Sequence, residues 1–322
     1  MLDNELNLSE ASAMTEEEAR DYIESIIWPN GPVCPHCGSN RLSWEIKSKA
    51  ARPGVYKCAD CEQQFTVTVG TIMHGSHITL RQWVIDFHLM TSSKKGVSAL
   101  QIQRNLGLGS YRSAWHLAHR IRLAMNTSEF KSLLKGTVEV DETYVGGKPR
   151  KGNRGNSEIK SKRGRGTKKV PVLALVERNG DVVSRPIERV NAKTLKGAIR
   201  ENCHKDCCIM TDEWPSYMGI GKEFNGGHEV IRHNRKEYVR GNASTNTVES
   251  YFALLKRGIH GTFHHVSKNH LHRYCDEFSF RWNNRKVDDA KRTIAVIRNA
   301  EGKRLSYKPL INFGTGCECR DI

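Results

Sequence analysis

The 322-residue sequence contains no apolar stretch that approaches the ~18 residues needed to cross a lipid bilayer. It also lacks the apolar core of a secretory signal near its beginning, where the acidic segment MLDNELNLSE stands instead. These absences predict a protein of the cytoplasm of a bacterial cell, without a membrane partner. The sequence has no internal repeat either.

Acidic residues are the minority among the charged side chains. The chain has 51 Lys and Arg against 35 Asp and Glu, which gives a formal net charge of +16. Such an excess creates a long-range field that attracts a polyanion, and nucleic acid is the usual one. A basic chain whose charge only keeps it soluble is the weaker alternative. A nucleic-acid partner would place the protein at the nucleoid.

The overall composition is that of a folded protein. Hydrophobic residues make up 38% of the chain and charged residues 27%, which excludes wholesale disorder. At this length we expect one sizeable core with one or two smaller modules.

Four of the ten cysteines form two Cys-x-x-Cys pairs, CPHCG and CADC, with twenty residues between them. In a chain without an export signal this pattern favours metal thiolates over disulfides. A redox site would need only one pair. Four thiolates close a tetrahedron around Zn²⁺ and leave no position open, so the zinc is expected to be structural, in a zinc ribbon with strands in LSWEI and QQFTVTV. The expected ligands are Cys34, Cys37, Cys58 and Cys61.

The region between the start of the chain and residue 130 reads as helical outside the ribbon. TEEEARDYIESIIWPNG predicts an amphipathic helix with a capping box from Thr15 and Glu18. Residues 98–125 predict a helix, a glycine-containing turn and a second helix, with caps at Ser98 and Ser110. This pair is either a DNA-binding helix-turn-helix or a plain packing unit. In the first case the second helix would display Arg112, His116, His119, Arg120 and Arg122.

After Lys135 the pattern changes from helical to one that predicts strands. Strands are expected over 138–145, 170–178 and 182–190, followed by a helix over 192–203 and the buried strand CCIMTD. This order indicates an α/β or α+β architecture.

A basic segment, residues 148–169, separates the first two of these strands and contains ten Lys or Arg against one Glu. Its Gly and Lys content cannot pack a core, so it predicts a mobile loop. The loop is either a solvated hairpin connection or a segment that binds phosphates, and its position directly after an acidic strand favours phosphates. The candidate DNA contacts in it are Lys151, Arg154, Lys162, Arg163, Arg165, Lys168 and Lys169.

Three acids stand at points where a cluster could form. Asp141 lies in the strand TVEVDETYVGG, Asp212 ends CCIMTD, and Glu249 lies in the helical segment STNTVESYFALLKRG. Singly, each reads as a turn residue or a solvated charge. Together they predict oxygen ligands for Mg²⁺ or Mn²⁺, because crowded carboxylates need a hard cation to compensate them. Two such ions can promote an in-line phosphoryl transfer.

The neighbours of these acids are sorted by periodicity. Strand alternation puts Glu139 on the face of Asp141 and Glu142 on the opposite face, so Glu139 is a possible supporting acid and Glu142 is not an expected ligand. Lys256 follows Glu249 by seven residues, about two helical turns, and therefore points to the same side.

These motifs together resemble the insertion-sequence transposases that have an N-terminal zinc ribbon and an ISXO-type DDE domain. The resemblance rests on the ribbon, the helical middle, VEVDETYVGG, TDEWPSY and NTVESYFALLKRGIHGTFHHVSKNHLHRYCDEFSFRWNNRK. It implies a ribonuclease H-like domain, with a mixed five-stranded sheet and flanking helices. It also implies an enzyme that cuts the element ends and joins their 3′-hydroxyls to target DNA. The implied catalytic residues are Asp141, Asp212, Glu249 and the DNA contact Lys256.

The expected organisation follows from the motifs and the resemblance. An acidic helix (1–30) precedes the zinc ribbon (31–75), the helix-turn-helix-like region (76–130), the DDE domain (135–290) and a C-terminal tail (291–322), in which Cys317 and Cys319 have no assigned role. The expected partners are double-stranded DNA of the element ends and the target, and further copies of the chain in a dimer or larger oligomer. Two alternatives stay open: a DNA-binding regulator whose catalytic domain is inactive, and a nuclease of the same fold that hydrolyses without joining.

Overall fold

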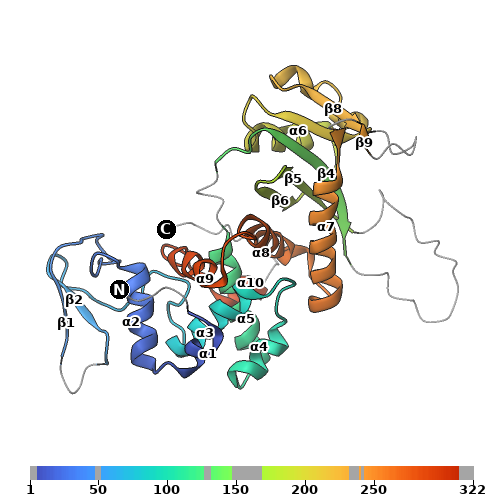
Figure 1. Cartoon of the computed structure of the whole chain (residues 1–322). Helices are drawn as coiled ribbons and strands as arrows, with labels where there is room; N and C mark the ends of the chain where they lie inside the picture. Colours follow the sequence, from blue (N-terminus) through green and yellow to red (C-terminus); the bar gives the residue numbers. More distant parts are fainter. Residues whose placement is uncertain are drawn as a thin grey trace, which may run out of the picture. The chain divides into compact units, whose positions relative to one another are not determined.

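The chain, as a computed structural model, is described over residues 6–47, 52–126, 132–146, 169–231, 239–240 and 243–311 (Figure 1). It divides into two compact units. The first unit contains the residues up to Thr127 and again those from Asn284, and the second unit contains Ser128–Asn283. None of the helices in the described ranges is long and apolar enough to span a membrane.

The first unit is helical outside its ribbon. The capping box of Thr15 and Glu18 starts the second helix as predicted, and Ser98 and Ser110 accept hydrogen bonds at the starts of α4 and α5. Gly107, at φ 64°, ends α4 in the left-handed conformation that glycine adopts without strain. The helices are α1 (Leu8–Ala13), α2 (Glu16–Ile27), α3 (Leu80–Ser92), α4 (Ala99–Leu106), α5 (Tyr111–Met125), α9 (Asp289–Arg298) and α10 (Tyr307–Ile311).

The segment expected as a C-terminal tail contributes to this unit. Helix α9 packs against α2, α3 and α5 with Ile294, Val296 and Ile297 buried. The hydroxyls of Thr91 and Thr293 lie 2.8 Å apart, and the backbone of Ile72 donates to Ala300 O at 3.0 Å. The second unit ends at Asn283 and not at 290. Residues 284–311 are therefore an integral part of the helical core.

The zinc ribbon consists of β1 (Ser43–Glu45), β2 (Tyr56–Cys58) and β3 (Gln64–Phe65), which form an antiparallel sheet in sequence order. Strand β2 was not expected, and only two residues of QQFTVTV are in a strand. Trp28, directly after α2, contacts the rings of Tyr56 and Phe65 edge-on, with centroids 5.5 and 5.7 Å away. The acidic helix α2 is thus attached to the ribbon by an aromatic cluster.

A mixed five-stranded sheet, in the order β6-β5-β4-β7-β8, forms the second unit. The first three strands are antiparallel neighbours, whereas β7 and β8 run parallel to β4. This is the sheet expected of a ribonuclease H-like domain. The strands are β4 (Thr137–Val145), β5 (Val170–Glu177), β6 (Val182–Pro186), β7 (Cys208–Asp212) and β8 (His228–Ile231), with a short pair β9 (Val239–Arg240) and β10 (Ala243–Ser244).

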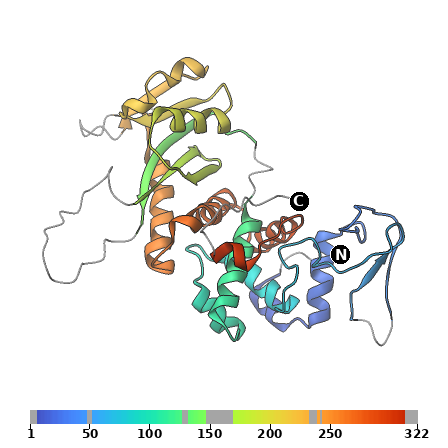
Figure 2. The ribbon, with the colours of Figure 1, turned by 180° about the vertical axis from the view of Figure 1, so that it is seen from behind.

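Helices cover both faces of this sheet (Figures 1 and 2). Val138 and Val140 of β4 pack against Leu195 and Ile199 of α6 (Ala192–Asn202) on one face. On the other face, the apolar side of α7 (Asn246–Gly258) and of α8 (Leu271–Asn283) packs against β5 and β6. Helix α7 also lies along β4, so the strand and helix that carry two of the predicted acids are in contact.

Candidate active site and zinc centre

The parallel pairing of β4 and β7 brings two of the predicted acids together. Val140 pairs with Thr211, so Asp141 and Asp212 are the next residues on neighbouring strands. The backbone N–H of Glu142 donates to Asp141 Oδ1 at 2.7 Å, and that of Trp214 donates to Asp212 Oδ1 at 3.0 Å. The two carboxylates therefore lie on adjacent central strands of the sheet, each held by a backbone hydrogen bond.

Glu249 lies near these two acids, in the first turn of α7. Its side chain is exposed, and Thr245 Oγ1 lies 3.4 Å from its Oε1. Helix α7 also carries Lys256, which is exposed in its last turn. Glu249 is near enough to Asp141 to influence its protonation.

Burial and the neighbouring carboxylates raise the pKa of Asp141 from its usual 3.8 to about 7. Burial is the main cause, and the charges of Glu142, Asp212 and Glu249 add to it, while the hydrogen bond from Glu142 N–H opposes it. The three carboxylates are not all within 4.8 Å of one another: among the described residues, the four ribbon cysteines are the only group of three or more His, Cys, Asp or Glu with ligand atoms that close. Asp141, Asp212 and Glu249 nonetheless offer carboxylate oxygens from neighbouring elements, and these are the donors that a hard divalent cation prefers.

The two other acids of β4 face opposite ways, as alternation predicts. Glu142 accepts a hydrogen bond from the buried Tyr217 hydroxyl at 2.8 Å, on the face covered by α6. Burial raises the pKa of Tyr217 well above its usual value, so this hydroxyl stays a donor. Glu139, with no exposed surface, lies on the face of Asp141.

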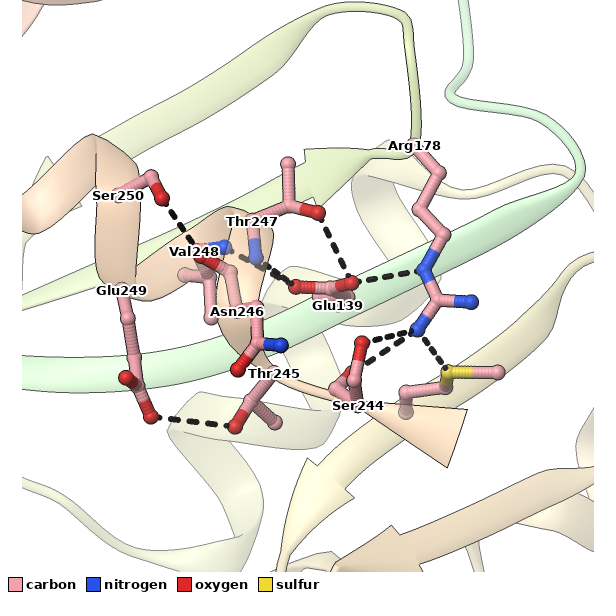
Figure 3. Close-up of polar contacts among 10 residues, drawn as sticks. Glu139, Arg178, Ser244, Thr245, Asn246, Thr247, Val248, Glu249 and Ser250 are labelled. Atoms are coloured by element: carbon pink, nitrogen blue, oxygen red, sulfur yellow. Dashed lines mark hydrogen bonds and ion pairs between the residues drawn. The ribbon is translucent and has the colours of Figure 1, made fainter. Parts of the chain in front are cut away.

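Glu139 is the centre of a polar network at the start of α7 (Figure 3). Its carboxylate accepts hydrogen bonds from the backbone of Thr247 and Val248 and forms an ion pair with Arg178, whose Nε lies 2.7 Å from Oε1. Arg178 also donates to Ser244. Sequence reasoning missed Arg178 and Ser244, because nothing in their local pattern distinguishes them from surface residues.

The prediction that α5 contacts DNA requires its basic side chains to be exposed, and only some of them are. Arg112 is exposed at the start of the helix. Arg120 is buried, and its guanidinium donates to His74 O at 2.9 Å and Leu305 O at 3.3 Å. His116 is half-buried and donates to the same carbonyl of Leu305 at 3.0 Å.

The expected display of this helix face to DNA is therefore wrong for Arg120, as it is for the buried His119 and Arg122. His116 and Arg120 face the interior of the first unit, where Leu305, in the segment after α9, accepts hydrogen bonds from both. In the basic loop, Lys169 is exposed directly before β5. The other candidates, Lys151, Arg154, Lys162, Arg163, Arg165 and Lys168, lie outside the described residues.

The four predicted zinc ligands converge. The Sγ atoms of Cys34 and Cys61 are 3.6 Å apart and those of Cys37 and Cys58 are 3.7 Å apart. A tetrahedron with Zn–S bonds of 2.3 Å has edges of roughly 3.8 Å, so these separations fit zinc. Backbone hydrogen bonds from Cys61 and Asp60 lower the pKa of Cys58 to about 7, whereas the pKa values of Cys37 and Cys61 are raised, so without metal Cys58 ionises more readily than those two thiols.

Two regions of the chain match transposase domain families. Residues 133–283 match the family model described as ISXO2-like transposase domain, and residues 14–64 match the transposase zinc-ribbon domain. The first match contains all three acids and the second all four cysteines. An uncharacterized protein in transposable element ISH50 of Halobacterium salinarum is 27% identical over 279 residues, which cover 83% of this chain and 91% of that protein.

Two solved structures align at low similarity. They are the Mos1 strand transfer complex and a pre-cleavage Mos1 transpososome, at 11% and 14% identity. The alignments cover 68% and 63% of this chain, and 78% and 74% of the Mos1 chains, with a TM-score of 0.20 in both cases. The fold of this chain is established by its own sheet order.

Proposed function

We propose that this chain, which matches the transposase zinc-ribbon domain and the ISXO2-like transposase domain, is a transposase that cuts the ends of its element and joins them to target DNA. The observation that carries this proposal is the meeting of Asp141 and Asp212 on parallel strands, with Glu249 beside them on α7. A DNA-binding regulator would need no such cluster.

In this proposal Asp141, Asp212 and Glu249 hold Mg²⁺ or Mn²⁺, two ions being the expected number. When bound, the ions would activate the attacking hydroxyl and stabilise the leaving oxygen. The 3′-hydroxyl oxygen of the element end forms a bond to a phosphorus of the target strand. The bond between that phosphorus and the 3′ oxygen of the preceding target nucleotide breaks. The attacking hydroxyl releases its proton to water, and the leaving oxygen takes one up.

The remaining residues would hold the DNA. Lys256 lies on the same helix as Glu249 and is proposed to contact a phosphate near the cut. The basic loop and Arg112 are proposed to bind the duplex through phosphates, which the net charge of +16 favours. We assign Cys34, Cys37, Cys58 and Cys61 to a structural zinc. Pairing two element ends would require a dimer or larger oligomer, acting at the nucleoid.

Incubation with Mg²⁺ and labelled DNA that carries the element ends tests the function. Joined products support the transposase. Nicks without joining would instead identify a nuclease of the same fold, and shifted bands without cleavage would identify a regulator. Glu249→Gln should abolish joining and leave end binding within about twofold, because it removes a proposed metal ligand and no DNA contact.

A further inference from the structure

The first turn of α7 has no cap from its own sequence. Thr245 occupies the N-cap position, but its side chain makes no capping hydrogen bond. A helix start leaves N–H groups without intrahelical partners, and a capping side chain normally accepts from the second or third of them. In α7 these are the N–H groups of Thr247 and Val248.

A residue from another element takes this role. Glu139 Oε2, from β4, accepts from Thr247 N at 2.7 Å and from Val248 N at 3.0 Å (Figure 3). Its Oε1 accepts from Thr247 Oγ1 at 3.0 Å and from Arg178 Nε at 2.7 Å. A negative charge is also favoured at a helix N-terminus by the helix dipole. One carboxylate of β4 thereby binds the first turn of α7.

Arg178 extends this contact to a third element. Its Nη2 donates to Ser244 O at 3.1 Å and to Ser244 Oγ at 2.7 Å, directly before α7, and lies 3.1 Å from Met210 Sδ in β7. Its own backbone N–H donates to Thr137 O at the start of β4. The guanidinium therefore ties β4, β7 and the approach to α7 together.

Three residues of this network each lie two positions before a proposed metal ligand. Glu139 lies two residues before Asp141 on β4, Met210 lies two residues before Asp212 on β7, and Thr247 lies two residues before Glu249. On the strands this spacing keeps both residues on one face. A single network thus fixes all three backbones that carry the acids.

We infer that Glu139 and Arg178 are positioning residues, which set where Glu249 stands relative to Asp141 and Asp212. A buried ion pair contributes little to stability compared with apolar residues of similar size, so stability alone does not account for a fully buried carboxylate here. The inference rests on the proposed function, since it assigns a role to residues that support its metal ligands.

Glu139→Gln is the sharpest variant because it keeps the shape of the side chain. Four donors converge on the two oxygens of Glu139. A glutamine offers one oxygen and one NH₂ group. One orientation turns the NH₂ group toward the N–H groups of Thr247 and Val248; the other turns it toward Arg178 Nε and leaves only the Thr247 hydroxyl able to accept from it. We expect faster hydrogen exchange at the amides of Thr247 and Val248, and a loss of strand-transfer rate of about 10- to 100-fold.

The Mg²⁺ dependence separates positioning from general destabilisation. Strand transfer by Glu139→Gln should need several-fold more Mg²⁺ for half-maximal rate, while end binding stays within about twofold of wild type. Glu277→Gln is the matched control, because Glu277 is also fully buried and pairs with an arginine, Arg281, within α8 of the same unit. It should lower the melting temperature without changing the Mg²⁺ dependence or the exchange of the α7 amides.

Further variants keep the test decisive. Glu139→Gln combined with Arg178→Gln should be no slower than the slower single variant, because the two residues act as one unit. Arg178→Lys keeps the charge but loses the fork that reaches Glu139 and Ser244, so it should show a smaller shift of the same kind and serves if Glu139→Gln does not fold.

Wild-type Mg²⁺ dependence in folded Glu139→Gln, or in Arg178→Lys where the former does not fold, overturns the positioning role. The positioning role is also overturned if the variant, like Glu277→Gln, only lowers the melting temperature and leaves the Mg²⁺ dependence and the exchange of the α7 amides unchanged. If Asp141→Asn and Glu249→Gln still join DNA at the wild-type rate, the proposed function itself fails. If they are inactive while Glu139→Gln behaves as wild type, only the positioning role fails.

Discussion

Among single residues, Asp141 has the protonation most sensitive to its surroundings. The folded chain holds this proton up to about pH 7, whereas the unfolded chain loses it near 3.8. Between these values the folded state binds more protons, so the stability of the protein without added Mg²⁺ falls as the pH rises through this window and stays reduced above it.

Asp141→Asn removes this titration. Without added Mg²⁺, the variant should therefore melt at a higher temperature than wild type at pH 8, and the difference should shrink toward pH 5. Added Mg²⁺ should raise the melting temperature of wild type more than that of the variant, and the variant should not join DNA. Thermal unfolding at both pH values measures this. A variant that is less stable than wild type at pH 8 would contradict the assigned cause of the raised pKa.

Two arginines of α5 separate packing from DNA contact. Arg120→Met leaves the His74 carbonyl without this donor and the Leu305 carbonyl with only His116, and should lower the free energy of unfolding by about 2 kcal/mol. Arg112→Ala removes an exposed side chain and should leave that free energy within about 0.5 kcal/mol. Denaturant unfolding measures both.

The DNA affinities should show the reverse order. Arg112→Ala is expected to weaken end binding in a gel-shift titration, whereas folded Arg120→Met should bind as wild type does. Equal binding by all three proteins would remove Arg112 from the interface.

The limits of sequence reasoning at this scale are set by distance along the chain. Alternation was enough to place Glu139 with Asp141 and Glu142 opposite. The partners of Glu139 are 39 residues away at Arg178 and 108 residues away at Thr247, so no local pattern could pair them. The periodicity of α5 likewise gave the spacing of its basic residues but not which face the returning chain covers.

The zinc ribbon is the element whose fold depends most on a bound ion, since its three strands are no longer than three residues each. Removing zinc with a chelator, or changing Cys58 to Ser, should expose residues 31–69 to proteolysis, because metal binding supplies the folding free energy of such modules. The second unit should resist under the same conditions. Metal analysis should find one zinc per wild-type chain; a ribbon that stays protected without zinc would contradict this assignment.

The basic loop, which lies largely outside the described residues, tests the electrostatic part of the proposal. Replacing its Lys and Arg by Ser and Gln should weaken DNA binding at low salt. Each lost phosphate contact should reduce the slope of log affinity against log salt by about 0.9. An unchanged slope would show that other residues supply the phosphate contacts.

Short elements were the least predictable. The strands β4, β5 and β7 carry clear apolar runs, and the sequence located them. Strand β2 spans three residues and β8 four, with half-exposed or exposed side chains at most positions, so neither has a period to detect. The fifth strand of the main sheet entered the prediction only through the resemblance.

At the scale of the whole molecule, the first unit is assembled from two separate parts of the sequence. The boundary expected at 290 followed the end of the recognisable motifs, whereas the structure divides the chain after Asn283. Helix α9 is amphipathic and short, and nothing in its sequence states which earlier helices it covers. Only the fold shows that its buried side faces α2, α3 and α5.

Truncation after residue 283 should therefore damage the distant end of the chain. Loss of α9 would expose the surfaces of α3 and α5 and leave Arg120 without Leu305. The truncated protein should show increased proteolysis and hydrogen exchange in residues 80–125, with the sheet of the second unit retained. Hydrogen exchange by mass spectrometry makes the comparison. Unchanged protection of α3 and α5 would contradict an integral role for residues 284–311.

The division of the first unit also has a consequence for synthesis. A ribosome makes α2, the ribbon and α3 to α5 first, but these cannot complete their packing until α9 emerges, after the entire second unit. A message broken or frameshifted within the second unit would thus yield a fragment whose amino-terminal helices remain incompletely folded. Such a fragment should be degraded rather than accumulate as an inactive competitor for the element ends.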